Sequence, residues 1–517
     1  MKRTLVFIIF ILIGFSTQAQ APYTFNKTQY FWGDSTHMLN TIMSFTKVDS
    51  VLYMAVGMKD ANKQVQRLTV VNTDLQGNVI NKKKISSDQY DSYMHAANSI
   101  LFDKDSNIVI GAVLMSDSID GYVVKMDRNL DIKWLKRYDI YDLPGASSSI
   151  SPGQNINNEF MSVDQTYDGG YILSGRTEKD TLSSFEPGYI IKLDTAGNVQ
   201  WSKLYDQASA IHEVVQTPDS GFVFADCKSG LTINKTDQYG NIVWQRKKLA
   251  GQGNMAPGEV ALMNNQYVVS ISPYAYKQLS PHTYRFALQV VKYDLQGNLQ
   301  FDKRFRIHKS FESRTINQGF GLETNAKGEI FIGGTSFVIH EFAPDTGGYK
   351  GVLLKLNSQG DSLWSRYYST NGLADLNQFN DLILMDDGGF MACGYHQPYP
   401  FTYNWGAWLV RMDSMGMAPG AYTVDVEYPK KKPENAQIHL YPNPARTQVT
   451  IDLSGLPQPE TYQLGLYNMS GEKVKNMRIR KSRKQINLEG LEPGLYLYRA
   501  TTKSNTKTYQ GKFIKVE

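Results

Sequence analysis

Eight histidines are the first candidates for chemistry, because imidazole titrates near neutral pH and is the commonest metal ligand in proteins. Seven fall in or beside the longest connections between predicted strands, whereas His439 begins the C-terminal region. The seven are His37, His95, His212, His282, His308, His340 and His396. No two have the spacing of a zinc motif such as H-x-x-x-H. Either they converge on one site or they only reflect polar loops, and we predict no metal and no cofactor.

Acidic residues in the same connections could form the acid–base pair of a glycoside hydrolase, although charged loops are more often only solvated. They are Asp139, Asp142, Glu178, Asp180, Glu186, Glu312, Glu341 and Asp345. Nucleophile-elbow, phosphate-loop and zinc-protease motifs are absent from the sequence. Gly33-Asp-Ser35 matches a fragment of an esterase pattern without its partner motif. Asp103-Lys-Asp105 resembles part of a calcium loop but coincides with a recurring turn, so we interpret it as structural. We assign no catalytic residue.

Aromatic side chains give a stronger lead, because exposed tyrosine and tryptophan rings suit glycans and protein partners. They concentrate in or beside two long connections, at residues 273–285 and 396–406. The candidate ligand-binding residues are Tyr274, Tyr276, Tyr284, Tyr399, Tyr403 and Trp405. The alternative is that these rings pack the long connections onto one another.

One phrase occurs seven times and indicates the architecture that must position these residues. It usually begins with a basic residue, continues with Asp two positions later and Gly three positions after that, and often ends with Trp. The copies begin at Asn72, Lys125, Lys192, Lys235, Lys292, Lys355 and Arg411. Repeats of a few tens of residues indicate a propeller, a solenoid or another array.

Each repeat consists of short strands separated by turns. Residues 160–205 contain four β-rich runs bounded by Gly, Asp and Asn, and four strands are typical of a propeller blade. We therefore predict an all-β fold, with a seven-bladed β-propeller over residues 20–424. The Trp or Phe that ends five of the seven copies is expected to pack between blades. Leu130 replaces the turn glycine in the second copy, so that turn is expected to differ.

The two ends of the repeat region are complementary. The seventh copy has no fourth strand after Gly416, whereas residues 23–32 form a strand without a partner. We predict that this N-terminal strand completes the seventh blade, because ring closure removes exposed strand edges. In an up-and-down blade the short turns share one face and the long connections share the other, which we call the long-loop face. Binding residues concentrate on variable loops held by a rigid scaffold, so this face is the expected binding surface.

The N-terminus has the three parts of a secretory signal. A basic start, an apolar run over residues 5–15 and a small residue at Ala19 or Ala21 predict a signal peptide at residues 1–19. The apolar run is shorter than the roughly 20 residues that span a bilayer. We therefore expect a chain that is exported, does not span a membrane and is monomeric.

Composition excludes some classes of protein. A formal charge of +5 over 517 residues, without a basic stripe, argues against nucleic acid as a partner. Cys227 and Cys393 each follow an apolar strand, where a small buried thiol is the usual interpretation. A disulfide between them remains the alternative.

A proline-containing, basic linker at residues 425–437 precedes a different pattern. Several short strands over residues 438–517 predict a small Ig-like β-sandwich. Four segments distinguish it: Tyr441-Pro442-Asn443-Pro444, Tyr467-Asn-Met-Ser470-Gly471, Leu491-Glu-Pro-Gly494-Leu-Tyr496 and Lys512-Phe513-Ile-Lys-Val516. In this order they resemble the type A C-terminal sorting domain of type IX secretion substrates in Bacteroidota. The alternative is an accessory Ig-like binding domain.

These resemblances imply a location more than an activity. A sorting domain implies recognition by the type IX secretion machinery, and a protein that is secreted or displayed on the outer-membrane surface. The central repeats are similar to those of secreted bacterial propellers, including the quinoprotein-like class, but the adjacent cysteines that quinone-dependent enzymes often carry are missing. We predict a binding or adhesion module with a glycan or protein ligand on the long-loop face. The alternative is an extracellular carbohydrate-active or other enzyme with its site at the centre of that face.

Overall fold

The computed structural model contains β-strands and turns but no helix in the part of the chain that it describes. The described residues are 24–29, 38–60, 66–85, 91–93, 99–115, 119–139, 158–177, 187–226, 230–248, 258–280, 283–305, 318–340, 343–370, 375–398, 405–419, 421–423, 438–453, 461–480, 483–502 and 508–517. No membrane-spanning helix occurs within these ranges. The chain divides into two compact units, Met1–Pro429 and Lys430–Glu517. The predicted signal peptide and the predicted linker lie outside the described residues.

The described strands of the first unit form antiparallel sheets, which we number in chain order. The first sheet contains β2 (Met38–Val48), β3 (Val51–Asp60), β4 (Gln66–Asp74) and β5 (Val79–Lys84). The second contains β6 (Asp91–Tyr93), β7 (Ile100–Phe102), β8 (Ile108–Met115), β9 (Ile119–Met126) and β10 (Ile132–Tyr138). The third contains β11 (Asn158–Gln165), β12 (Tyr171–Thr177), β13 (Gly188–Leu193) and β14 (Val199–Tyr205).

The remaining sheets follow the same order along the chain. The fourth contains β15 (Val214–Gln216), β16 (Phe222–Asp226), β17 (Thr232–Thr236) and β18 (Ile242–Lys247). The fifth contains β19 (Glu259–Met263), β20 (Tyr267–Ser280), β21 (Thr283–Asp294) and β22 (Leu299–Phe305). The sixth contains β23 (Gln318–Thr324), β24 (Ile330–His340), β25 (Ala343–Leu356), β26 (Ser362–Tyr368) and β30 (Ala421–Thr423). The seventh contains β27 (Leu376–Leu384), β28 (Phe390–Gln397), β29 (Gly406–Met412) and β1 (Phe25–Gln29).

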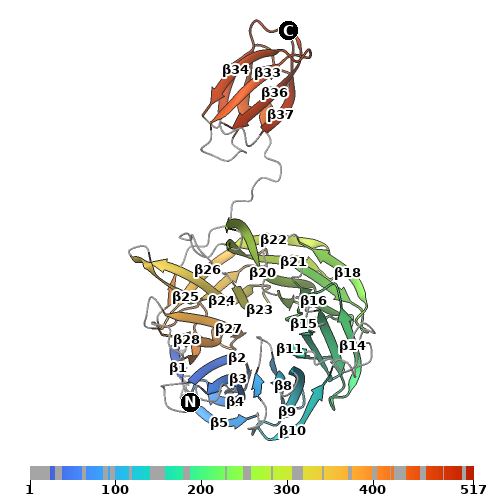
Figure 1. Ribbon diagram of the computed structural model, residues 1–517, viewed down its shortest axis with the longest axis vertical. Helices are drawn as coiled ribbons and strands as arrows, with labels where there is room; N and C mark the ends of the chain where they lie inside the picture. The colour runs from blue at the N-terminus through green and yellow to red at the C-terminus, as the bar shows by residue number, and fades with distance from the viewer. Residues whose placement is uncertain are drawn as a thin grey trace, which may run out of the picture. The chain divides into compact units, whose positions relative to one another are not determined.

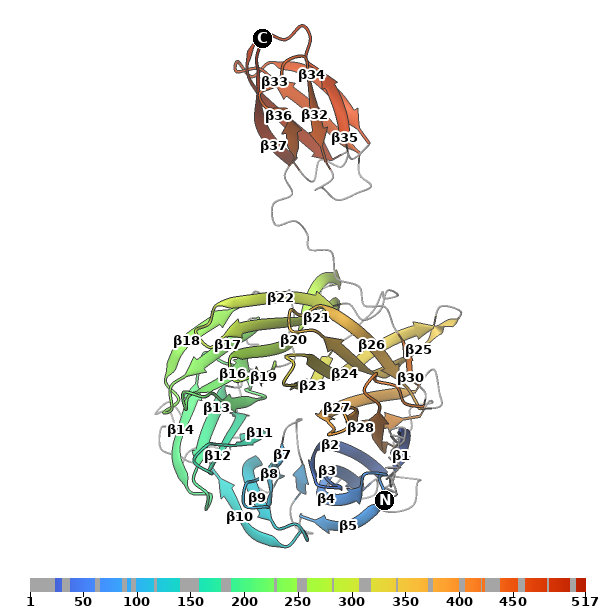
Figure 2. The same cartoon turned by 180° about the vertical axis from the view of Figure 1, so that it is seen from behind.

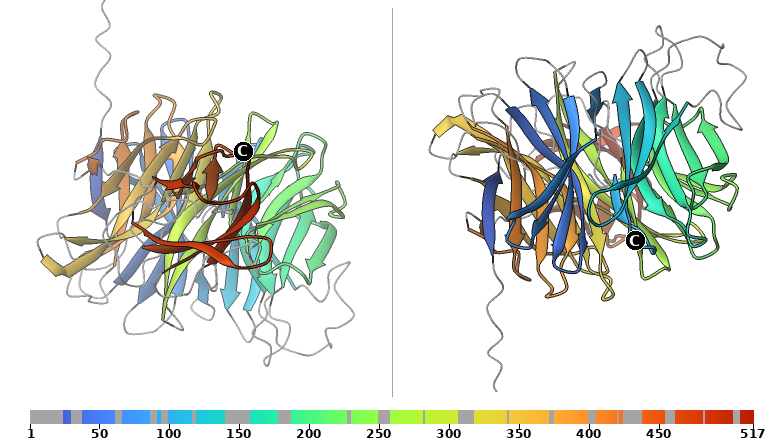
Figure 3. Two further views of the ribbon diagram at one scale, coloured as in Figure 1. Left: turned by 90° about the horizontal axis from the view of Figure 1, so that it is seen from above. Right: turned by 90° about the horizontal axis from the view of Figure 1, so that it is seen from below.

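The sheets lie around a common centre, with the first strand of each toward the inside and the last toward the outside (Figures 1 and 2). Viewed from the side, the strands run between the two faces of this arrangement (Figure 3). Seven clusters of buried apolar side chains each join two consecutive sheets, and one of them joins the seventh sheet to the first. Burial of apolar surface between neighbouring sheets is therefore the main source of stability.

The N-terminal strand completes the seventh sheet, as predicted. Residues Phe25–Gln29 pair antiparallel with β29, so that Phe25 faces Arg411 and Gln29 faces Ala407. The side-chain amide of Asn26 accepts a hydrogen bond from Trp408 Nε1 at 2.6 Å. At the other end of the region, β30 pairs with the outer strand of the sixth sheet instead of extending the seventh.

The recurring Asp-x-x-Gly turns form as expected, with one correction. In the fourth sheet Asp237 Oδ1 accepts hydrogen bonds from the backbone N–H groups of Tyr239 and Asn241, and Gly240 has a φ of 78°. The expectation that the second copy forms a different turn is wrong, because Leu130 adopts a φ of 69° and its N–H donates to the Asp127 carbonyl. The Leu130 side chain is fully buried between the first and second sheets, and this burial offsets the unfavourable backbone conformation.

The aromatic residue that ends five of the seven phrases packs against the next sheet, as predicted. A Cβ added to Gly197 would lie 3.0 Å from Trp134, and one added to Gly416 would lie 2.6 Å from Trp364. Trp244 instead donates from Nε1 to the carbonyl of Leu295 in the next sheet. The turn glycines therefore serve two needs, a positive φ and space for the ring of the preceding sheet.

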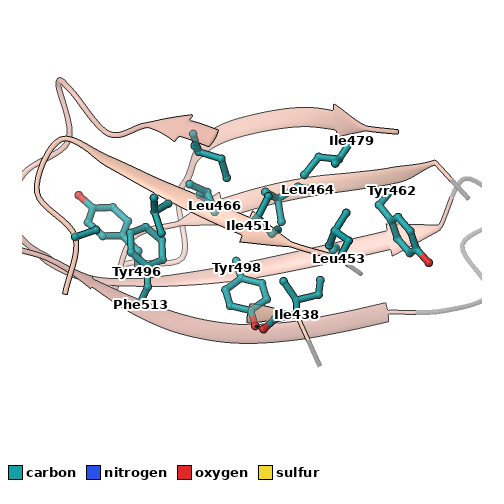
Figure 4. Packing of buried hydrophobic residues seen from close by; sticks show 14 of the residues in the cluster. Ile438, Ile451, Leu453, Tyr462, Leu464, Leu466, Ile479, Tyr496, Tyr498 and Phe513 are labelled. Atoms are coloured by element: carbon teal, nitrogen blue, oxygen red, sulfur yellow. Dashed lines mark hydrogen bonds between the residues drawn. The ribbon is translucent and has the colours of Figure 1, made fainter. Parts of the chain in front are cut away.

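The second unit consists of two antiparallel sheets. One contains β31 (His439–Tyr441), β32 (Gln448–Asp452) and β35 (Arg483–Asn487). The other contains β34 (Lys473–Ile479), β33 (Tyr462–Tyr467), β36 (Gly494–Thr502) and β37 (Thr508–Lys515). Side chains of both sheets, including Ile451, Leu464 and Phe513, form one core (Figure 4).

The first and last of the four segments named for this unit meet in space. Asn443 Oδ1 accepts a hydrogen bond from Ile514 N–H at 2.8 Å, and Ala445 N–H donates to the Ile514 carbonyl at 2.8 Å. Phe513 is buried and stacks on Tyr496, with ring centroids 5.6 Å apart. Lys512, Ser470 and Gly471 remain exposed. The segments therefore form one edge of the unit and two exposed turns.

Candidate functional site

The predicted ligand-binding rings lie on elements of the fifth and seventh sheets. The structure describes the side chains of Tyr274 and Trp405. It describes only the backbone of Tyr276 and Tyr284, in β20 and β21, and Tyr399 and Tyr403 lie outside the described residues. Of the predicted loop carboxylates, only Asp139 has a described side chain.

Both described rings have an intramolecular partner. The guanidinium carbon of Arg304 lies 3.8 Å from the centroid of the Tyr274 ring. Trp405 stacks on Tyr395, with ring centroids 4.5 Å apart and an interplanar angle of 8°. Tyr395 and Trp405 are only partly buried, so this stacked pair also presents aromatic surface to solvent.

A polar cluster lies at the long-loop end of the sixth and seventh sheets. His396, in β28, places Nε2 at 3.1 Å from Oδ2 of Asp375, which immediately precedes β27. Lys350, in β25, donates from Nζ to Ser369 Oγ at 3.0 Å and to the Asp375 carbonyl at 3.4 Å. Lys350 is only 1% exposed, so its ammonium group is held inside the protein.

Burial changes the protonation of this cluster. It lowers the pKa of Lys350 to about 8, against the opposing effect of the Asp375 carboxylate. Burial also lowers the pKa of His396, although the hydrogen bond with Asp375 raises it. At neutral pH His396 is therefore mainly a neutral imidazole that donates from Nε2 to Asp375. Its Nδ1 atom is buried and has no hydrogen-bond partner among the described residues.

This arrangement can accept a proton or bind a polar group. A neutral imidazole held by a carboxylate has one ring nitrogen free to act as an acceptor, as in general-base catalysis. A buried ammonium such as Lys350 can stabilise an anionic or carbonyl oxygen. Within the described ranges, no three histidine, cysteine or acidic side chains are placed to share a metal ion.

A cavity of about 390 Å³ lies along the inner strands β7, β11, β15, β19 and β23. Three acidic side chains line it: Asp164, Glu213 and Glu323. Burial raises the pKa of Asp164 to about 6 and that of Glu323 to about 8, and the Asp381 carboxylate adds to the second shift. Burial and then repulsion from Glu259 raise the pKa of Glu213.

Glu213 and a further inner carboxylate, Asp381, connect neighbouring sheets. Glu213 Oε2 accepts a hydrogen bond from Val260 N–H at 2.7 Å, which joins the fourth sheet to the fifth. Asp381 Oδ2 accepts from Ser44 Oγ at 2.8 Å and from Phe45 N–H at 3.2 Å, which joins the seventh sheet to the first. These contacts give the inner carboxylates a structural role.

Sequence reasoning found one member of the polar cluster and missed two. His396 was among the histidines predicted at the long-loop face, whereas Lys350 and Asp375 were not singled out. The usable signal was a lysine that opens an apolar strand, Lys350-Gly-Val-Leu-Leu354, because buried lysines are rare. Of the other predicted histidines, only His212 has a described side chain, and it is partly exposed before β15.

The structure also resolves the Asp103-Lys-Asp105 fragment and one cysteine. Asp103 is buried and accepts hydrogen bonds from Tyr171 Oη at 2.7 Å and from Asn107 N–H at 2.8 Å, so its structural interpretation is confirmed. Cys393 is a buried free thiol, whereas the side chain of Cys227 lies outside the described residues.

Comparison with protein families assigns the C-terminal region. Residues 439–516 match a protein family described as "Secretion system C-terminal sorting domain". The second unit is a type IX sorting domain. A protein that carries this domain is exported and reaches the cell surface or the medium, and the domain implies contact with the secretion machinery. No curated protein matches the chain significantly.

Among solved structures, distant β-propellers resemble the chain. The WD40 β-propeller domain of Doa1 has 11% identity and a TM-score of 0.39, covering 72% of this chain and 95% of its own. BamB from Moraxella catarrhalis has 11% identity and a TM-score of 0.36, covering 75% and 100%. PorZ, a surface component of the type IX secretion system of Porphyromonas gingivalis, has 11% identity and a TM-score of 0.26, covering 92% and 81%. None of these likenesses is close enough to support a function.

Proposed function

We propose that this chain is a seven-bladed β-propeller with an Ig-like sorting sandwich, exported from a member of the Bacteroidota by type IX secretion. It acts as a binding module with a glycan or protein ligand on the long-loop face. The count of seven blades is supported by the apolar clusters that join consecutive sheets and by the cluster that joins the seventh to the first. The pairing of β1 with β29 supports a closed ring.

One observation carries the proposed binding site. The partly exposed Tyr395–Trp405 stack and the Asp375–His396–Lys350 cluster share strand β28, where Tyr395 and His396 are consecutive residues. Consecutive strand residues point to opposite faces of a sheet, so the seventh sheet presents a ring on one side and polar groups on the other. The partly exposed rings of Tyr395 and Trp405 offer a flat apolar surface on which a sugar ring can stack, and a glycan is therefore the favoured ligand.

The binding proposal is tested with the full chain and a panel of neutral oligosaccharides in isothermal titration calorimetry. Trp405→Ala is expected to weaken binding about tenfold or more, because aromatic anchors dominate such interfaces. Tyr239→Ala is the matched control, since Tyr239 is 61% exposed in a short turn on the opposite face. Equal affinities for Trp405→Ala and the unmodified chain would contradict the proposed site. If the chain binds a protein partner but no sugar, the ligand is a protein and not a glycan.

A second candidate function is catalysis at the same face. It rests on His396 Nδ1, which is buried and has no hydrogen-bond partner among the described residues, in a ring held by Asp375. If a sugar that binds is also cleaved, His396→Gln should abolish turnover while affinity changes little. Retained turnover in this variant would exclude His396 as the base.

The proposed export is tested by deleting residues 438–517 in the native host. The truncated chain is expected to accumulate in the periplasm, because the remaining propeller lacks the sorting domain. Its appearance at the surface in normal amounts would contradict the role of this unit.

A further inference from the structure

The cations that open the repeated phrase have carboxylate partners in five of the seven sheets. Each partner lies in the first hairpin of the same sheet, which in the second sheet is the hairpin between β7 and β8. The pairs are Lys125–Asp103 at 2.9 Å, Lys192–Asp168 at 2.9 Å, Lys235–Asp219 at 2.9 Å, Lys355–Glu329 at 2.8 Å, and Arg411–Asp387. The repeated basic residue therefore has a structural function in these sheets, which is to neutralise a turn carboxylate.

The five hairpins that supply these carboxylates are each five residues long, and the hairpin of the fifth sheet is shorter. In the fourth sheet the last paired residues are Gln216 and Phe222, with five residues between them. In the fifth sheet the corresponding pair is Met263 and Tyr267, so the hairpin is two residues shorter and consists of Asn264, Asn265 and Gln266. This shorter connection contains no acidic residue.

Lys292 keeps its charge although its sheet has lost the carboxylate. In the first sheet the hairpin consists of Asp49 and Ser50, and Asn72 stands at the position of the basic residue. In the fifth sheet Lys292 is retained and is 8% exposed. Its Nζ donates to the Ser358 carbonyl at 3.0 Å and lies 4.0 Å from the centroid of the Tyr267 ring. Among the described residues, no carboxylate forms an ion pair with it.

Lys292 lines a pocket of about 440 Å³ between the fifth and sixth sheets, on the short-turn face. Its wall also contains Tyr267, Phe301, Lys327 and side-chain amides. The volume lies in the range of small-ligand sites. Burial lowers the pKa of the Lys292 ammonium, as expected for a cation without a counter-ion. An incoming anion would restore the missing partner.

We propose that this pocket binds a small molecule or residue that carries a carboxylate, with Lys292 as its counter-ion. The ligand carboxylate takes the place that Asp219 has beside Lys235 in the fourth sheet. Lys327 adds a second positive charge at the rim, where it is exposed. Tyr267 and Phe301 contact the body of the ligand, which is about the size of one sugar ring. The site lies on the opposite face from the proposed binding site and does not depend on it.

The test is isothermal titration calorimetry of the full chain with glucuronate, N-acetylglutamate and glucose as probes. Glucuronate and glucose differ only in the charged group, and glucuronate and N-acetylglutamate separate a sugar acid from an amino acid. Loss of one charge-assisted hydrogen bond lowers affinity about 10- to 100-fold. Lys292→Met is therefore expected to weaken binding of the preferred acid by that factor, and glucose should not bind the pocket.

Two further variants keep the result interpretable. Lys235→Met removes an equivalent lysine that already has a carboxylate, and it should leave acid binding unchanged. Asn264→Asp places a carboxylate on the pocket wall at a residue with a φ of 51°, which aspartate tolerates, and it should block acid binding while the chain stays folded. Binding of either acid that survives both Lys292→Met and Asn264→Asp would overturn the proposal, as would absence of binding by both acids.

Discussion

The fourth and fifth sheets carry the same lysine at the same position of the same repeat, in different electrostatic surroundings. Lys235 is 2% exposed at its side chain and pairs with Asp219 at 2.9 Å. Lys292 contacts a backbone carbonyl and an aromatic ring. The hairpin of the fifth sheet is two residues shorter than that of the fourth and contains no acidic residue. A pocket lies beside Lys292 instead. A structural ion pair and a candidate ligand site can therefore differ by one short turn.

The largest expected effect is a change in the free energy of unfolding when the lysine of the fourth or the fifth sheet is replaced by methionine. Lys235→Met should lower the free energy of unfolding by about 1–2 kcal/mol, because Asp219 loses its cation while the lysine site stays buried. Lys292→Met should be neutral or stabilising, since an apolar side chain of similar length replaces a buried charge without a carboxylate. Urea unfolding of the full chain, followed by tryptophan fluorescence, compares the two variants. Equal destabilisation by both substitutions would contradict the proposed difference between the two lysines.

A hairpin graft should produce the next largest effect. Replacing residues 264–266 with Thr-Pro-Asp-Ser-Gly, the sequence of residues 217–221, gives Lys292 a carboxylate partner. We expect up to about 1 kcal/mol of added stability, because the new pair is partly exposed, and loss of acid binding. The matched control is the same graft with Asn in place of its Asp, which lengthens the turn without adding charge. If both grafts behave alike, turn length alone explains the result.

The smallest expected effect is the pH dependence of the two sheets. Burial raises the pKa of Asp219, but hydrogen bonds from Thr217 and Lys235 outweigh it and leave the pKa lowered. This contribution to stability is present above the unfolded pKa of about 4 and is lost as pH falls through the lower folded value. Lys292 contributes in the alkaline range instead, and in the same direction. Its folded pKa lies below 10.5, so stability rises with pH between that folded value and 10.5. Lys292→Met should remove only the alkaline rise, measured by urea unfolding at several pH values.

Much of the fold could be predicted because the repeat encodes it locally. The Asp-x-x-Gly turns and the aromatic residue that follows each act within a few residues or on the adjacent repeat, so their spacing is visible in one sequence. The partner of residues 25–29 was also predictable, because one strand was missing at one end and unpaired at the other. Leu130 was the exception, since its tolerance of a positive φ depends on burial against a neighbouring sheet.

The candidate sites could not be predicted to the same depth because they depend on contacts between distant residues. Asp375 and His396 meet across two strands, and Lys350 reaches them from the preceding sheet. Lys292 looked like every other basic residue that opens the phrase. Only the register of β19 and β20, which shows the shortened hairpin, distinguishes it from Lys235. The predicted rings at Tyr399 and Tyr403 stay predictions.

The most direct test of this account is an NMR titration of the Lys292 side chain in the full chain, after reductive ¹³C-methylation of its lysines and with Lys292→Arg used to assign the signal. We predict that the pKa of Lys292 lies below 10.5. It should rise when the preferred acid, glucuronate or N-acetylglutamate, is added, because a carboxylate stabilises the charged form. A pKa of Lys292 at or above 10.5 that neither acid changes would contradict the claim that Lys292 is a buried cation that binds the carboxylate of a ligand.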